Sequence, residues 1–112
     1  MKNYSELSDS DKVRAILATV REPVTRKMVL EFAGIDTSKL KEEQQKEFES
    51  IMAKHKASQP EGYKGPEKFW VPLDAQESVI QGLGVEWKSV HGQISDVLLK
   101  EIDFDLGPEG KV

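Results

Sequence analysis

The side chains best suited to catalysis or metal binding are few and scattered along the chain. There are two histidines, His55 and His91, and no cysteine. None of the HExxH, GxSxG, Walker or GxGxxG patterns occurs. His55 falls at the end of an expected helix, where a histidine interacts with the helix dipole, and His91 falls beside an apolar stripe. We therefore expect a protein that is not an enzyme and that has no metal, no cofactor and no small-molecule substrate.

Two further groups of residues resemble ligand sites but have simpler explanations. Gly62 and Gly65 flank Tyr63 and Lys64, yet no strand precedes them and no helix follows closely, as a phosphate-binding loop requires. A plain turn explains them. Trp70 and Trp87 have the flat rings on which bases stack, but both lie in apolar patterns and are expected in the core.

Composition places the chain among single-domain globular proteins. It has 112 residues, of which 38% are apolar and 32% charged. Its apolar runs are far too short to span a bilayer, and the first eleven residues lack the apolar core of a signal peptide. The absence of cysteine fits a reducing compartment. We expect a cytoplasmic protein without a membrane association.

The formal charge of −4 is unevenly distributed. Residues 12–68 contain 12 lysines and arginines and 9 acids, a balance of +3. Residues 1–11 carry −2, and residues 69–112 carry −5. A mildly basic centre between acidic ends can mark a half of the protein that faces phosphates.

A first helix is expected up to about Val20, after a frayed lead-in over residues 1–8. Its apolar residues Val13, Ile16, Leu17 and Val20 recur at i, i+3, i+4 and i+7. Either Ser8 or Ser10 caps it, and the residues before Pro23 end it, because the residue before a proline avoids the helical region.

Residues 23–40 carry an unusually complete set of helix end signals. Thr25 is a good N-cap, and Val24 and Val29 occupy the two positions of a hydrophobic staple. The helix then runs over residues 26–33 and ends at Gly34, which is suited to a left-handed conformation. A short helix, a glycine turn and a second helix form a helix-turn-helix unit.

The second helix of this unit is expected over residues 38–56, capped by Asp36, Thr37 or Ser38. Its apolar face has a polar gap at Gln44 and otherwise consists of Leu40, Phe48, Ile51 and Met52. A loop follows over residues 57–68, and then a strand over residues 69–71 that can pair with Val24.

The last third of the chain predicts two more helices. Asp74 caps a short one over residues 75–81, and the last helix covers residues 86–102. Acids and apolar residues alternate over residues 101–106, and such a segment either packs on its own domain or docks in a partner's groove. In the second case Ile102, Phe104 and Leu106 would be the partner-binding anchors.

Residues 12–72 resemble a winged helix-turn-helix. The residues that carry the likeness are Pro23, Val24, Thr25, Arg26, Lys27, Ala33, Gly34 and Ile35. The expected fold is mainly α and winged helix-turn-helix-like, with a small β element and an additional C-terminal helix. It divides into a flexible N-terminus (1–11), the winged-helix-like domain (12–72), a packed helical extension (73–102) and an acidic flexible tail (103–112).

The resemblance implies a surface that binds double-stranded DNA. In the family the third helix enters the major groove, and the loop before the last strand, the wing, touches the DNA backbone. Carried over by position, the nucleic-acid-binding residues are Thr25, Arg26 and Lys27 at the second helix, Ser38, Lys39, Lys41, Gln44 and Gln45 at the third, and Tyr63, Lys64 and Lys68 in the wing.

The chain departs from the family pattern in ways that leave two functions open. Leu30 stands where the family prefers a small residue, and Glu43 or Gln44 where it expects an apolar one. Acids at 42, 43 and 49 also lie beside Lys39 and Lys46 on the presumed reading face, and carboxylates repel phosphates.

The first hypothesis is a small transcription regulator that binds DNA weakly and dimerises through its last helix. The second is an acidic interaction module, an adaptor or inhibitor of the kind that phages encode, which uses its acidic C-terminal third to bind a protein of the transcription or replication machinery. A continuous positive face from Arg26 through Lys41 to Lys64 would favour DNA. A face interrupted by Glu42 and Glu43 would favour a protein.

Overall fold

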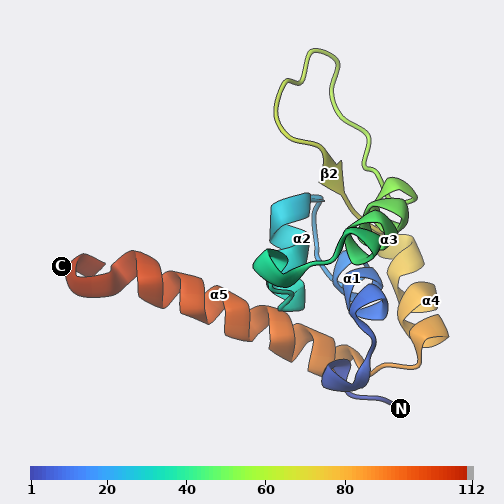
Figure 1. Ribbon diagram of the computed structural model, residues 1–112, viewed down its shortest axis with the longest axis horizontal. Helices are drawn as coiled ribbons and strands as arrows, with labels where there is room; N and C mark the ends of the chain where they lie inside the picture. The colour runs from blue at the N-terminus through green and yellow to red at the C-terminus, as the bar shows by residue number, and fades with distance from the viewer. Residues whose placement is uncertain (111–112) are drawn as a thin grey trace.

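The computed structural model describes the backbone of residues 1–110 and the side chains of residues 1–99. The described residues are mainly helical with one two-stranded antiparallel sheet, which confirms the expected mainly α class with a small β element. The elements, shown in Figure 1, are the short 3-10 turns η1 (Tyr4–Glu6) and η2 (Thr37–Lys39), the helices α1 (Asp9–Leu17), α2 (Arg26–Ala33), α3 (Glu42–Ala53), α4 (Leu73–Leu83) and α5 (Trp87–Gly110), and the strands β1 (Val24–Thr25) and β2 (Lys68–Phe69).

Helix α1 is the centre of the core. It begins after Ser8, whose hydroxyl accepts a hydrogen bond from the Asp11 backbone N–H at 3.2 Å. Val13, Ile16 and Leu17 are completely buried, and α2, α3, α4 and α5 all contact this helix. Each such side chain contributes about 1.5–3 kcal/mol when it is fully buried. The apolar stripe was thus correctly assigned, although α1 ends at Leu17 rather than at Val20.

Helix α2 has the bounds that the sequence predicts. The Thr25 hydroxyl accepts from the Met28 N–H at 3.3 Å, as expected of an N-cap. At the other end Gly34 has φ +78°, and the Ile35 N–H donates to the Leu30 carbonyl at 3.0 Å. These bonds satisfy groups that a helix end otherwise leaves unpaired.

The small sheet joins the start of α2 to the segment after the loop. Val24 pairs with Phe69 and Thr25 with Lys68, which confirms the predicted pairing of Val24. Strand β2 covers residues 68–69 instead of the expected 69–71, so Trp70 and Val71 lie outside it. On the other edge of β2 the Ala57 N–H donates to the Lys68 carbonyl at 2.9 Å. The segment after α3 therefore also runs antiparallel to β2, and residues 58–67 form a loop that extends from the body (Figure 1).

The prediction of one continuous helix over residues 38–56 is wrong. Asp36 accepts hydrogen bonds from the backbone N–H and the hydroxyl of Ser38, and this starts the separate turn η2. Leu40 and Lys41 are extended, and α3 starts only at Glu42. The Gln44 side chain accepts from the Lys41 N–H at 3.2 Å, so the residue that interrupted the apolar pattern caps the helix.

The N-terminal residues are packed rather than frayed, contrary to the prediction. Tyr4 and Leu7 are buried, and the Tyr4 hydroxyl donates to the Ala33 carbonyl at 2.7 Å. The backbone of Lys2 bonds to Gly84 and Glu86 at 2.8 and 3.0 Å. Because Ser5, Glu6 and the neighbouring residues are polar, no apolar pattern indicated that Tyr4 and Leu7 are buried.

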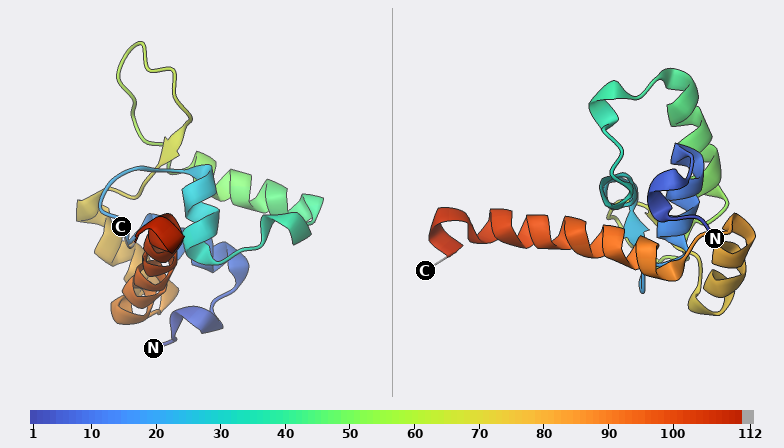
Figure 2. Two further views of the ribbon diagram at one scale, coloured as in Figure 1. Left: turned by 90° about the vertical axis from the view of Figure 1, so that its left-hand side faces the viewer. Right: turned by 90° about the horizontal axis from the view of Figure 1, so that it is seen from below.

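Helices α4 and α5 are both longer than predicted. Helix α4 begins after Pro72 instead of Asp74, and α5 continues through residues that were expected to form a flexible tail. Figures 1 and 2 show the second half of α5 extending away from the body. No helix in the described part of the chain combines the length and the apolar character that a membrane span requires.

Candidate functional site

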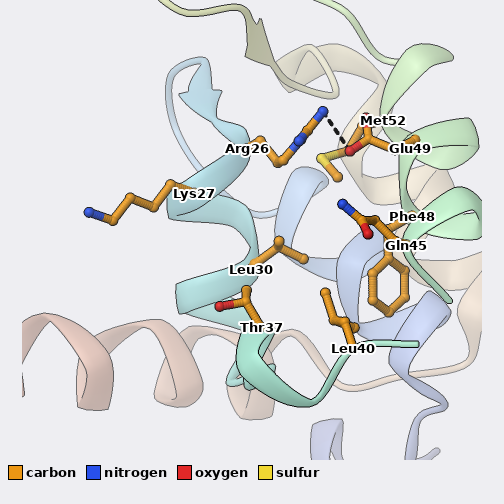
Figure 3. A pocket seen from close by; sticks show the side chains of 9 residues that line it. All are labelled: Arg26, Lys27, Leu30, Thr37, Leu40, Gln45, Phe48, Glu49 and Met52. Atoms are coloured by element: carbon orange, nitrogen blue, oxygen red, sulfur yellow. Dashed lines mark ion pairs between the residues drawn. The ribbon is translucent and has the colours of Figure 1, made fainter. Parts of the chain in front are cut away.

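A groove of about 300 Å³ separates α2 from α3, and Figure 3 shows its lining. Both helices pack on α1, but the turn η2 and the extended residues after it hold them apart. The groove has an apolar floor and a polar rim. The floor is made by Leu30, Leu40, Phe48 and Met52, and the rim by Arg26, Lys27, Thr37, Gln45 and Glu49.

An ion pair crosses this groove. The Arg26 Nη2 lies 2.5 Å from the Glu49 Oε2, and both side chains are partly exposed. Lys27 lines the same groove, but its amine extends away from it (Figure 3). The arginine expected to contact phosphate is therefore already paired with a carboxylate, and a phosphate would have to displace that carboxylate.

The exposed face of α3 is acidic. The helix carries four glutamates and one lysine, a net charge of −3. Glu42, Glu43 and Glu47 are exposed, and the Lys46 amine lies 3.6 Å from the Glu42 carboxylate. The positive face that DNA binding requires is consequently interrupted at α3.

The other residues predicted at the third helix lie elsewhere. Ser38 and Lys39 belong to η2, and Lys41 precedes α3. Hydrogen bonds from the Ser38 hydroxyl and then from its backbone N–H lower the pKa of Asp36. Of the two glutamines, Gln44 caps α3, and Gln45 alone joins Arg26 and Lys27 around the groove.

Of the predicted wing residues, Tyr63 and Lys64 lie on the loop and Lys68 lies on β2 (Figure 1), and none of the three lines the groove. The Tyr63 hydroxyl donates to the Pro66 carbonyl at 2.9 Å, and its ring covers Gly65, so this tyrosine shapes the loop. Lys64 is exposed, whereas Lys68 is half-buried in the sheet beside Thr25, whose hydroxyl is occupied by the α2 cap.

The loop also carries acids that offset its lysines. The Lys56 amine lies 2.7 Å from the Glu67 carboxylate. The hydrogen bond from Lys56 and its charge, followed by the charge of Arg26, lower the pKa of Glu67. Residues 58–67 carry Lys64 against Glu61 and Glu67, a net charge of −1, and the flanking Lys56 and Lys68 raise the balance only to +1.

His55 and Trp70 line a second cavity, at the base of the loop, together with Lys54 and Lys56. Burial, followed by the charges of Lys54 and Arg14, lowers the pKa of His55. The Trp70 indole N–H donates to the Val20 carbonyl at 3.0 Å. The Trp70 ring is thus held by the body of the protein, and the His55 ring is half-buried beside it.

Two of the residues that make the groove a site, Leu30 and Glu49, were not predicted as site residues. Glu49 was identified only as an unfavourable charge, and Leu30 only as a departure from the family pattern. Their roles depend on how far α2 and α3 separate, which periodicity does not reveal. The side chains of Ile102, Phe104 and Leu106 lie outside the described residues.

Comparison with known proteins adds no assignment: no family model, no curated protein and no solved structure matches this chain.

Proposed function

We propose that this protein is a non-enzymatic interaction module of winged-helix architecture that binds a protein partner through α3. The observation that carries this proposal is the acidic exposed face of that helix, formed by Glu42, Glu43 and Glu47. A net charge of −3 on the helix that would enter the DNA groove repels phosphates. The same charge attracts a surface rich in lysine and arginine and speeds association with it.

The order of elements supports the winged-helix part of the proposal. Helix, short strand, helix, turn and helix are followed by two antiparallel segments joined by a loop. Strand β2 lies between β1 and the segment around Lys56, so the loop of residues 58–67 occupies the place of a wing. Architecture alone does not determine what such a domain binds, and the site must do so.

The groove beside α3 gives the partner a place to anchor. Protein interfaces combine a small apolar centre with a polar rim, and most binding energy comes from a few anchor residues. Leu30, Leu40 and Phe48 supply an apolar floor, and the Arg26–Glu49 pair forms part of the rim. An apolar side chain of the partner would enter the groove while its basic residues meet the exposed acidic face of α3, which begins beside the groove at Glu42.

Weak binding of double-stranded DNA is the second candidate. It is favoured by the exposed lysines at 27, 39, 41 and 64, which are free of ion pairs within the described residues. In this case Arg26→Ala and Lys39→Ala would each weaken binding and flatten its salt dependence, because each lost phosphate contact reduces counterion release.

Affinity capture with matched charge variants tests the first candidate. The bait proteins are the wild type, Glu43→Lys/Glu47→Lys on α3, and Glu77→Lys on the exposed face of α4. We expect a partner with a basic surface to be recovered by the wild type and by the α4 variant, and to be lost from the α3 variant. Equal recovery by all three baits would exclude α3 as the binding surface.

A further inference from the structure

A second groove, of about 410 Å³, lies between α2, α5 and the turn after α1. Its lining is mostly apolar and includes Val20, Phe32 and Ile94. Met28 on one rim is 38% exposed and Leu98 on the other is 43% exposed, which is unusual for large apolar side chains that line one continuous groove. This face has no connection with α3 or with the ion pair of Arg26.

The apolar surface continues from this groove along α5. Val90, Ile94 and Val97 face the body and are buried or half-buried, whereas Leu99 is 58% exposed. In the sequence, Ile102 and Leu106 follow Leu98 at i+4 and i+8, a spacing that places them on the same side of a helix. The apolar stripe that starts at Leu98 and Leu99 therefore continues, by its spacing in the sequence, into the part of α5 that extends from the body.

The second half of α5 extends from the body without a neighbour in the described structure (Figures 1 and 2). A helix of about 12–15 residues is only marginally stable in water, and most helices are stabilised by packing of an apolar face. An extended helix that already exposes Leu98 and Leu99 in its described part thus needs a covering surface.

We propose that a second copy of this chain covers that surface, with the two α5 helices antiparallel and the stripe of each copy in the α2–α5 groove of the other. The arrangement is self-complementary, as a twofold dimer requires, because one helix provides both the groove wall and the protruding stripe.

Charge selects the antiparallel orientation. Glu101, Asp103 and Asp105 make the far part of α5 acidic, and a parallel pair would place these carboxylates beside their own copies. An antiparallel pair places them beside the first half of the other α5, where Lys88 and Asp96 give a net charge of zero, and near Arg21 on the groove. Glu22 is the only acid among the residues that line the groove.

The length of α5 is consistent with an interface that includes the groove. Its 24 residues extend about 36 Å, and a strip one helix wide covers on the order of 400 Å² per copy. Specific interfaces bury about 800 Å² per partner, so contact between the two α5 helices alone is too small. Filling the groove with the stripe adds the α2 surface around Met28, whose side chain is 38% exposed.

Sedimentation velocity over a range of micromolar concentrations tests the dimer. We expect reversible dimerisation of the full chain, and at least about a tenfold weaker association for Leu98→Glu/Leu99→Glu. Leu73→Glu is the matched control, since Leu73 on α4 is also 58% exposed but does not line the groove. A wild type that stays monomeric, or the same association in both variants, would overturn the proposal. Circular dichroism verifies that each variant is folded.

Single cysteines test the orientation, because the natural chain has none. Position 99 is close to the middle of α5, so Leu99→Cys is expected to form a disulfide across the twofold axis. Position 88 lies three turns earlier on the same side of the helix, and Lys88→Cys should not cross-link. Efficient cross-linking through position 88 would show a parallel pair and contradict the proposal, as would the failure of position 99 to cross-link.

Discussion

Arg26 at the start of α2 and Glu49 in the middle of α3 form an ion pair 2.5 Å long across the groove between the two helices. The two residues are distant in the sequence, and their contact ties together helices that otherwise meet mainly through α1. The pair neutralises the arginine that is best placed to meet a phosphate. It therefore bears on both candidate functions, since it weakens the case for DNA and forms a polar rim for a protein partner.

A double-mutant cycle measures the strength of this pair. Because both side chains are partly exposed, we expect Arg26→Ala, Glu49→Ala and the double variant to show a coupling of about 0.2–1 kcal/mol in the free energy of unfolding. Denaturant unfolding at low salt measures the coupling energy, and the same experiment at high salt measures how far salt screens it. A coupling well above this range would mean that the pair is shielded from water, and no coupling would mean that it does not form in solution.

Gly34→Ala tests the turn that ends α2. With φ at +78°, a side chain here costs about 1–2 kcal/mol, and its Cβ would also lie 3.2 Å from the Gln93 Nε2. Gly92→Ala is the control, because an added Cβ there meets nothing within 4 Å and an alanine favours the helix by about 0.5–1 kcal/mol. Thermal unfolding should shift in opposite directions for the two variants. Shifts in the same direction would contradict the left-handed turn.

Gln76→Leu tests a buried polar contact that joins α4 to the core. The Gln76 side-chain amide donates to the Val20 carbonyl at 2.6 Å and to the Val71 carbonyl at 3.0 Å. Removing this donor should cost about 1–3 kcal/mol, because buried carbonyls then lose a partner. Chemical denaturation of Gln76→Leu, with the exposed Gln81→Leu as control, provides the comparison. Equal stability of the two variants would show that the buried amide contributes nothing.

Tyr4 is expected to make stability depend on alkaline pH. Burial, and then the charge of Asp9, raise the pKa of its hydroxyl above the value of about 10 for an exposed tyrosine. The unfolded chain loses this proton first, so the contribution is fully present below about pH 10 and decreases as the pH rises further. Tyr4→Phe should lower stability by about 1 kcal/mol at neutral pH, through loss of the bond to Ala33, and should flatten the alkaline decline.

Unfolding free energies between about pH 8 and pH 11 measure this effect. Tyr63→Phe, on the exposed loop, serves as the control that keeps the steeper decline. An unchanged alkaline profile in Tyr4→Phe would show that another group causes the pH dependence.

Short-range signals in the sequence were sufficient for α2 and for the sheet. Thr25 supplies a side-chain oxygen suited to an N-cap, and Gly34 readily takes the left-handed conformation that ends a helix. The structure places the ends of α2 at these two residues. The pairing of Val24 with Phe69 was also predictable. Residues 69–71 have the strongest strand pattern in the chain, and Val24 was the residue expected to be extended and free to pair with them.

The errors arise where polar residues decide the structure. Asp36 and Gln44 each cap a separate turn or helix, and the periodicity of apolar residues contains no sign of the break between them. Tyr4 reaches the core from a polar segment by bonding to Ala33, a contact between positions far apart in the chain. The groove exists because α3 starts at Glu42 and is separated from α2. Neither feature was predicted, so the groove could not be predicted from local sequence patterns.

The most direct test of the proposed function is the binding of a labelled DNA duplex at low ionic strength. Fluorescence anisotropy would compare the wild type with Glu42→Lys/Glu43→Lys/Glu47→Lys, which reverses the charge of the exposed α3 face. We expect no salt-sensitive binding by the wild type, and binding by the variant with a salt dependence that reflects its new phosphate contacts. Salt-sensitive binding of the duplex by the wild type, with equal or weaker binding by the variant, would contradict the claim that the acidic face of α3 directs this domain toward a protein.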